Sequence, residues 1–209
     1  MEGNGVARNL PRAARFGNDP PPSRDRMTLD PSIPDYARGR WWLWRLPLLL
    51  LLAGDVLGQY RGGAEEPTLF SGITFGVHEF GHLFFAFGGE TLTILGGSLM
   101  QVLIPLGAAA MIYHHRDYFG VTIVGLWLAS SLFDMAIYMA DARSFDLDLL
   151  SFGEEGGHDW AWLLQHWGVV QHNLGIASAV RGVGLLLLGA SVLSGLWLCY
   201  QMWAVPRDG

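Results

Sequence analysis

Five consecutive residues of this chain have the spacing of a zinc site. His78 and His82 are four residues apart, and Glu79 directly follows the first histidine. On an α-helix such a pair lies one turn apart on one face, so both imidazoles can bind a single zinc ion, Zn2+. Glu79 lies about 100° round the helix from His78, where its carboxylate can accept a proton from a water molecule at the metal. We therefore predict that His78 and His82 are metal ligands and that Glu79 is a catalytic general base.

The residues around this motif are almost all apolar, which argues against a chance match. The motif lies in a run from about residue 68 to residue 88 that consists mainly of Phe, Leu, Gly, Ile and Val. Ionisable groups inside a membrane-spanning segment are costly, and by default they mark a functional site. Three of them at metal-binding spacing are difficult to explain as packing.

Two histidine ligands leave room for a further protein ligand, and the sequence offers four candidates. Asp134 lies deep in a later apolar run, where an unpaired carboxylate would be costly. His158 opens a short amphipathic pattern in the longest loop. We rank Asp134 and His158 equally, ahead of Asp141 and Asp159.

Both leading candidates also have ordinary structural interpretations. Asp134 could form a hydrogen bond with Tyr138 or Gln101, and His158 could be a solvated loop residue. The residues alone therefore leave the third ligand open.

Small residues near the motif indicate where another helix could pack closely. Gly72 and Gly76 form a small-xxx-small pair, and Gly81 lies inside the motif. Residues 96–98, in the next apolar run, are Gly-Gly-Ser. Small residues allow two membrane helices to approach closely, so this segment is a candidate neighbour of the motif helix.

The composition indicates a membrane protein. Hydrophobic residues make up 51% of the chain and charged residues only 15%, against about 25% in ordinary soluble domains. A membrane-spanning helix needs about 20 apolar residues. We predict an all-α, polytopic membrane helical bundle with five transmembrane helices. The five runs extend over about residues 41–60, 68–88, 92–113, 119–140 and 176–203.

The chain divides into a tail and a membrane domain. Residues 1–40 are rich in Arg and Pro and lack an apolar pattern, so we predict a disordered tail. Residues 41–209 form the predicted transmembrane helical domain, with a polar loop at 141–172. Within that loop, residues 160–167 have the pattern of a short amphipathic helix.

The distribution of arginine predicts the orientation. Eight of the thirteen arginines precede or open the first apolar run, and positive residues favour the cytoplasmic side. We therefore expect the N-terminus in the cytoplasm. Five spans would then place the C-terminus outside and the loop at 141–172 in the cytoplasm.

The net charge of −6 and the absence of a basic patch exclude nucleic acid as a partner. The expected partners are the lipid bilayer and either a membrane protein substrate or a partner subunit. The single cysteine, Cys199, cannot form an internal disulfide.

Residues 70–106 resemble the site-2 protease family of intramembrane zinc metallopeptidases. The matching residues are His78-Glu79-Phe80-Gly81-His82, then Gly88-Gly89, then Gly97-Ser98-Leu99-Met100-Gln101 and Pro105. The resemblance implies zinc as the cofactor, His78 and His82 as its ligands, and Glu79 as the general base of a peptidase. Family members supply an Asp ligand from a later span, within an Asn-Pro…Asp-Gly type segment that this chain lacks; Asp134 is the nearest analogue.

A later stretch looks like that of uncharacterised bacterial membrane proteins with the same motif, which implies a bacterial inner membrane. It comprises Asp134, Asp141-Ala142-Arg143 and His158-Asp159-Trp160.

Two functions follow from these patterns. The first is a membrane-embedded zinc-dependent hydrolase, a peptidase acting on membrane or juxtamembrane protein segments. The second is a non-catalytic, metal-stabilised membrane subunit of a larger complex. A closed site with four protein ligands favours the second function, and a site with an open position favours the first.

Overall fold

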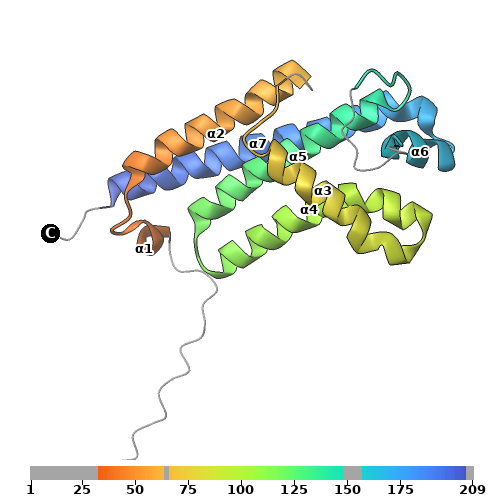
Figure 1. Ribbon diagram of the computed structural model, residues 1–209. Coiled ribbons are helices and arrows are strands. Elements are labelled where there is room, and N and C mark those ends of the chain that lie inside the picture. The colour runs from red at the N-terminus through yellow and green to blue at the C-terminus, as the bar shows by residue number, and fades with distance from the viewer. Residues whose placement is uncertain (1–32, 64–65, 148–156, 206–209) are drawn as a thin grey trace, which may run out of the picture. The chain divides into compact units, whose positions relative to one another are not determined.

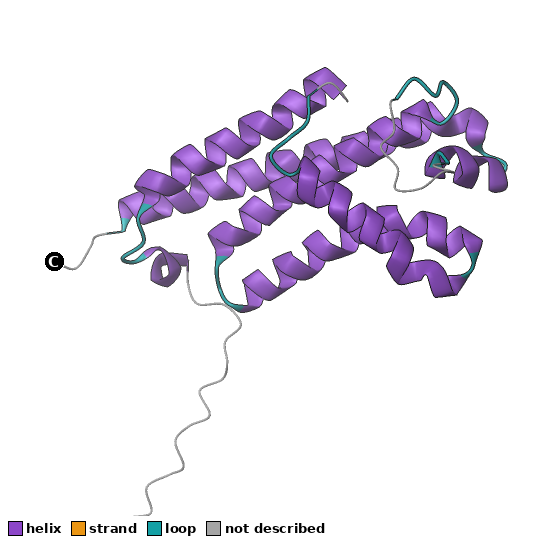
Figure 2. Cartoon of the chain, in the orientation of Figure 1, coloured by secondary structure: helices purple, strands orange, loops and turns teal. Residues whose placement is uncertain are grey.

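The computed structural model describes residues 33–63, 66–147 and 157–205, which form helices joined by loops and turns (Figures 1 and 2). No strand occurs among them, so the all-α prediction is confirmed for this part of the chain. The α-helices are α1 (Ile33–Ala37), α2 (Trp42–Gly62), α3 (Ser71–Phe85), α4 (Glu90–His114), α5 (Tyr118–Asp141), α6 (Asp159–His166) and α7 (Asn173–Ala204). Two 3-10 turns, η2 (Ala86–Gly88) and η3 (Val170–His172), follow α3 and precede α7.

Most of the predicted tail, residues 1–32, lies outside the described residues. Its last part differs from the prediction, because Ile33–Ala37 forms α1. The aromatic ring and hydroxyl of Tyr36 explain this ordering, since they are buried against α5 and form hydrogen bonds there.

Three helices are long and apolar enough to cross a membrane: α4, α5 and the segment Val170–Ala204 that contains α7. The predicted five spans are not confirmed. Helix α3 has 15 residues, which at about 1.5 Å per residue gives a length of about 22 Å, short of the roughly 30 Å hydrocarbon core. Helix α2 has 21 residues, but Arg45, Asp55 and Arg61 lower its hydropathy.

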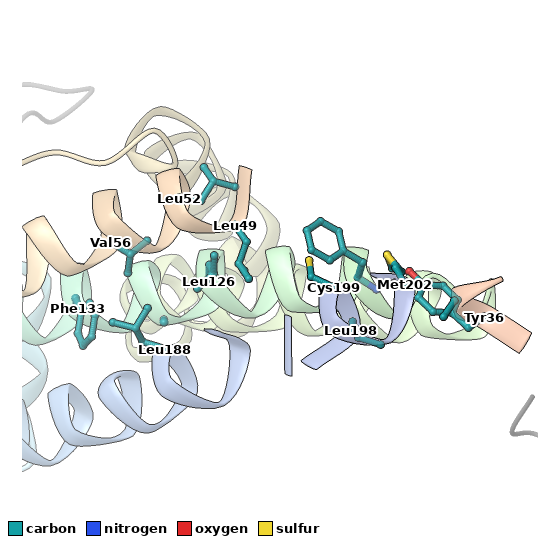
Figure 3. Packing of buried hydrophobic residues seen from close by; sticks show 13 residues of the cluster. Tyr36, Leu49, Leu52, Val56, Leu126, Phe133, Leu188, Leu198, Cys199 and Met202 are labelled. Carbon is teal, nitrogen blue, oxygen red and sulfur yellow. Dashed lines mark hydrogen bonds between the residues drawn. The ribbon is translucent and has the colours of Figure 1, made fainter. Parts of the chain in front are cut away.

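One end of the bundle, which we call the α1 end, brings together the start of α2, the loop between α4 and α5, and the end of α7. The Tyr36 hydroxyl donates to Asp117 Oδ1 at 2.8 Å and accepts from the Phe119 backbone N–H at 2.9 Å. The ring of Trp44 packs on that of Phe119, with centroids 6.2 Å apart. Met202, near the end of α7, belongs to one buried cluster with Tyr36 and Phe119 (Figure 3).

We call the opposite end of the bundle the α6 end. It brings together α6, the ends of α3 and α5, and the starts of α4 and α7. The Asn173 side chain donates to the Ala140 carbonyl at 2.8 Å, and the Trp160 indole donates to Ser98 Oγ at 3.0 Å. Leu163 also belongs to the buried cluster at this end. The predicted short helix in the polar loop is therefore confirmed as α6, and it lies at the end of the bundle away from α1.

Apolar packing between α2, α5 and α7 holds the membrane domain together (Figure 3). Leu49 and Val56 of α2, Leu126 and Phe133 of α5 and Leu188 of α7 are all buried in one cluster. These helices form the frame against which the hairpin of α3 and α4 is placed.

Helices α3 and α4 approach so closely that only glycine fits between them. A Cβ atom on Gly81 would lie 2.2 Å from the carbonyl oxygen of Gly96, and one on Gly97 would lie 2.6 Å from Cε1 of the His78 ring. The expected packing of Gly81 against residues 96 and 97 is thus observed. A Cβ on Gly76 would meet no atom of the described residues within 4 Å. The backbone of α4 therefore fixes the position of the His78 ring.

We predict that Gly81→Ala destabilises the protein by roughly 1–3 kcal/mol, because the new methyl group collides with backbone that cannot move aside. The control is Gly76→Ala, the same change in the same helix facing open space, which should be neutral or stabilising by up to about 1 kcal/mol. Thermal unfolding in detergent measures both. Equal melting temperatures for the two variants would contradict the close approach.

Candidate metal site

Helix α3 brings the three motif side chains together. The ring centroids of His78 and His82 are 4.7 Å apart, as expected for positions one turn apart. One nitrogen of each imidazole and the carboxylate of Glu79 lie within 4.8 Å of one another. His78 is buried, and Glu79 and His82 are half-buried. The local part of the predicted site is therefore present as geometry.

A carboxylate from α6 completes this group. Oδ2 of Asp159 lies 3.1 Å from Nε2 of His78 and 3.2 Å from Nε2 of His82. Zinc with bonds of 2.0–2.1 Å in tetrahedral geometry separates its ligand atoms by about 3.3 Å. The two distances from Asp159 Oδ2 to the histidine nitrogens are close to this separation.

Each histidine is oriented through its other nitrogen. Nδ1 of His82 lies 2.9 Å from the carbonyl oxygen of Thr93, and because a carbonyl only accepts, this nitrogen carries the hydrogen. Nδ1 of His78 lies 3.2 Å from Oε1 of Gln101, whose Nε2 donates to Asp134 at 3.0 Å. Acceptors at the second nitrogen of each ring are the usual outer partners of metal-binding histidines.

These hydrogen bonds have an electrostatic consequence for the space between His78, His82 and Asp159. With the hydrogen on Nδ1, a neutral ring turns its Nε2 lone pair toward this carboxylate oxygen, which is unfavourable, whereas a protonated ring donates to the same oxygen. Burial raises the pKa of Asp159, but the two imidazoles outweigh burial and hold this pKa below its ordinary value. The carboxylate is therefore ionised at neutral pH. A positive charge makes the arrangement favourable, and it can be a proton on a histidine or a cation between the three atoms.

His158 and Tyr138 position Asp159. Nδ1 of His158 accepts from the backbone N–H of Ala161 at 3.1 Å and caps α6, while its Nε2 lies 3.3 Å from Asp141 Oδ2. Burial lowers the pKa of His158, so the ring is neutral and Nδ1 is free to accept. The ring stacks on Tyr138, whose hydroxyl accepts the backbone N–H of Asp159 at 2.9 Å.

Asp134 and His158, the two candidates ranked first from the sequence, therefore lie near the histidine pair without facing it. Asp134 contacts His78 only through Gln101, which is the hydrogen bond considered as its alternative interpretation. His158 is turned toward Asp141 rather than toward the histidine pair. Asp159, ranked lower from the sequence, is the residue that the fold brings to both Nε2 atoms.

A small cleft lies beside Asp159 at the α6 end. Its volume is about 190 Å³, and its walls are formed by Ile94, Gly157, His158, Asp159 and Trp162. Pockets that enclose small organic ligands usually measure about 300–1,000 Å³. The cleft can thus admit water and part of a substrate, but it does not enclose a whole small molecule.

Comparison of the chain with protein-family models, curated proteins and solved structures finds no match. The resemblance to site-2 proteases therefore stays a prediction. Function has to be inferred from the side chains at the site.

We predict that Gln101→Leu lowers zinc affinity by about 10–100-fold, because His78 loses the acceptor that orients its ring. The control is Gln165→Leu, the same change on the exposed side of α6. Titration against a competing chelator in detergent measures both affinities. Equal affinities would show that the hydrogen bond to Gln101 does not orient a ligand.

Proposed function

We propose that this protein is a membrane-embedded zinc-dependent hydrolase, a peptidase that acts on membrane or juxtamembrane protein segments. The observation that carries the proposal is the approach of Asp159 Oδ2 to Nε2 of both His78 and His82, at 3.1 and 3.2 Å. The neighbouring Glu79 carboxylate supports a hydrolytic rather than a purely structural role.

Each of these residues has a distinct chemical role in the proposed reaction. His78, His82 and Asp159 hold the metal, and a bound zinc ion polarises a carbonyl and lowers the pKa of water toward neutrality. Glu79 accepts the proton of the attacking water and returns it to the leaving amine. Tyr138 and His158 keep the Asp159 carboxylate in place through α6.

The number of protein ligands supports catalysis. Catalytic zinc sites have three protein ligands and keep one position open, whereas structural sites are closed by four. Two histidines and Asp159 provide three, and the cleft beside Asp159 leads to solvent at the α6 end. Water can therefore reach the Asp159 side of the proposed metal site.

The surface beside the site supports a substrate that is itself partly apolar. Five large apolar side chains of α3 and η2 are exposed, namely Ile73, Phe80, Leu83, Phe84 and Phe87. In a membrane, such a surface contacts lipid or an apolar protein segment. We further propose that α2 crosses the bilayer as well, and that the short helix α3 enters it only part way.

One observation favours the non-catalytic alternative. The Glu79 carboxylate lies close enough to both imidazoles to act as a fourth ligand, which would close the site. The protein would then be a metal-stabilised subunit of a larger membrane complex, with zinc linking α3 to α6.

We expect the purified protein to contain about one zinc ion per chain, and Asp159→Ala to lose nearly all of it, because only two protein ligands remain. The matched control is Asp146→Ala, which removes an exposed carboxylate from the same connection between α5 and α6. Elemental analysis after size-exclusion chromatography measures the metal. Full zinc content in Asp159→Ala, with loss in Asp134→Ala or His158→Ala, would assign the third ligand to one of those residues instead.

Glu79→Gln separates the two functions. If Glu79 is the general base, this variant keeps its zinc and its melting temperature, and hydrolysis of unfolded casein as a probe falls by about 100–10,000-fold. If Glu79 is the fourth ligand of a structural site, zinc affinity and thermal stability fall together. Unchanged turnover with weaker zinc binding would end the hydrolase proposal.

A further inference from the structure

The three helices that are long enough to span a membrane connect the two ends of the bundle. Helix α4 runs from the α6 end to the α1 end, α5 returns, and α7 runs to the α1 end again (Figure 1). The side-chain contacts agree, because Gln101 meets Asp134 midway, while Tyr36 bonds to Asp117 at one end and Asn173 to Ala140 at the other. When these helices cross a bilayer, the two ends lie on opposite sides of it.

The candidate site belongs to the α6 end. His82 bonds to Thr93 in the first turn of α4, and Asp159 is the first residue of α6. The cleft beside Asp159 is formed by Gly157 and Trp162, which belong to the same end. Whatever reaches the metal therefore reaches it from this side.

The two ends of the bundle differ in their number of arginines, and this number predicts which end lies in the cytoplasm. Arg116 lies in the loop between α4 and α5 at the α1 end, and eight further arginines precede or open α2. These eight are Arg8, Arg12, Arg15, Arg24, Arg26, Arg38, Arg40 and Arg45. Positive residues near the ends of spans favour the cytoplasm, so the α1 end is the cytoplasmic end.

The α6 end carries little positive charge. Arg143 is the single arginine between α5 and α7, where the sequence is otherwise acidic, and Arg61 near the end of α2 and Arg181 near the start of α7 are the other two on this side. The five-span expectation placed this acidic connection in the cytoplasm. Because α5 runs away from the α1 end, the helix order places it on the other side, which agrees with the distribution of arginine.

We infer that the His78–His82–Asp159 site opens on the non-cytoplasmic side of the membrane and, resting on the proposed function, that its substrates are protein segments exposed at that surface. Water and zinc then also enter from the non-cytoplasmic side. A peptide bond presented from the cytoplasm would lie at the α1 end, separated from Asp159 by most of the length of α5, since Tyr36 bonds to Asp117 before α5 and Asp159 bonds to Tyr138 near its end.

Single cysteines report which side each end faces. The only cysteine of the chain, Cys199, is buried, so Cys199→Ala gives a background without a reactive thiol. Gln165→Cys marks the α6 end and His115→Cys the α1 end, and both positions are exposed and outside the site. The full chain is produced in bacterial cells, and sealed spheroplasts are treated with a membrane-impermeant maleimide before and after lysis.

We expect Gln165→Cys to be labelled in sealed spheroplasts, and His115→Cys only after lysis. Protection of Gln165→Cys until lysis, or labelling of His115→Cys before it, would overturn the inference. Labelling needs neither zinc nor turnover, and adding Glu79→Gln should leave the pattern unchanged. A zinc-free protein with the expected pattern would therefore refute the proposed function while the orientation stands.

Discussion

Two imidazole nitrogens and one carboxylate oxygen, drawn from segments about eighty residues apart, meet at hydrogen-bond distance, and the site depends on this contact. Thr93 and Gln101 hold the hydrogens on the far side of His82 and His78, so both lone pairs face Asp159. Such a contact is unfavourable unless a positive charge lies between the atoms. The fold therefore creates a need for positive charge beside the motif, which a proton on a histidine or the proposed metal ion would meet.

Maintaining that contact places demands on the packing of α4 and α6. Helix α4 must approach α3 at Gly81 and Gly96, because any greater separation would move His78 away from Gln101. Helix α6 must dock with its first turn fixed, which the hydrogen bonds from Trp160 to Ser98 and from Asp159 to Tyr138 achieve. Sites of this kind lose function when supporting residues shift by about an ångström, so these outer contacts matter as much as the ligands.

The parts of this site that depend on local spacing could be predicted from the sequence, and those that depend on docking could not. The i, i+4 relation of His78 and His82 is a property of one helix, and the apolar runs marked most of the long helices. Asp159 was ranked below His158, but the two residues are adjacent, and the sequence does not show which one turns toward the histidine pair. The fold decides this, since the His158 ring caps α6 and leaves Asp159 facing the pair. Similarly, the apolar run at 68–88 did not show that α3 ends at Phe85.

The shortness of α3 connects the chemistry to the membrane. The segment before α3 is held near the middle of α5, where Thr68 contacts Ser130 at 3.0 Å, and the helix then runs to the α6 end. His82 and Glu79 therefore lie toward one end of the bundle, where they remain half-buried, rather than at its centre. Ionisable groups cost least near the membrane surface, and a hydrolytic site needs water. The proposed part-way insertion of α3 and the proposed hydrolytic function are therefore compatible, because both place the motif near water.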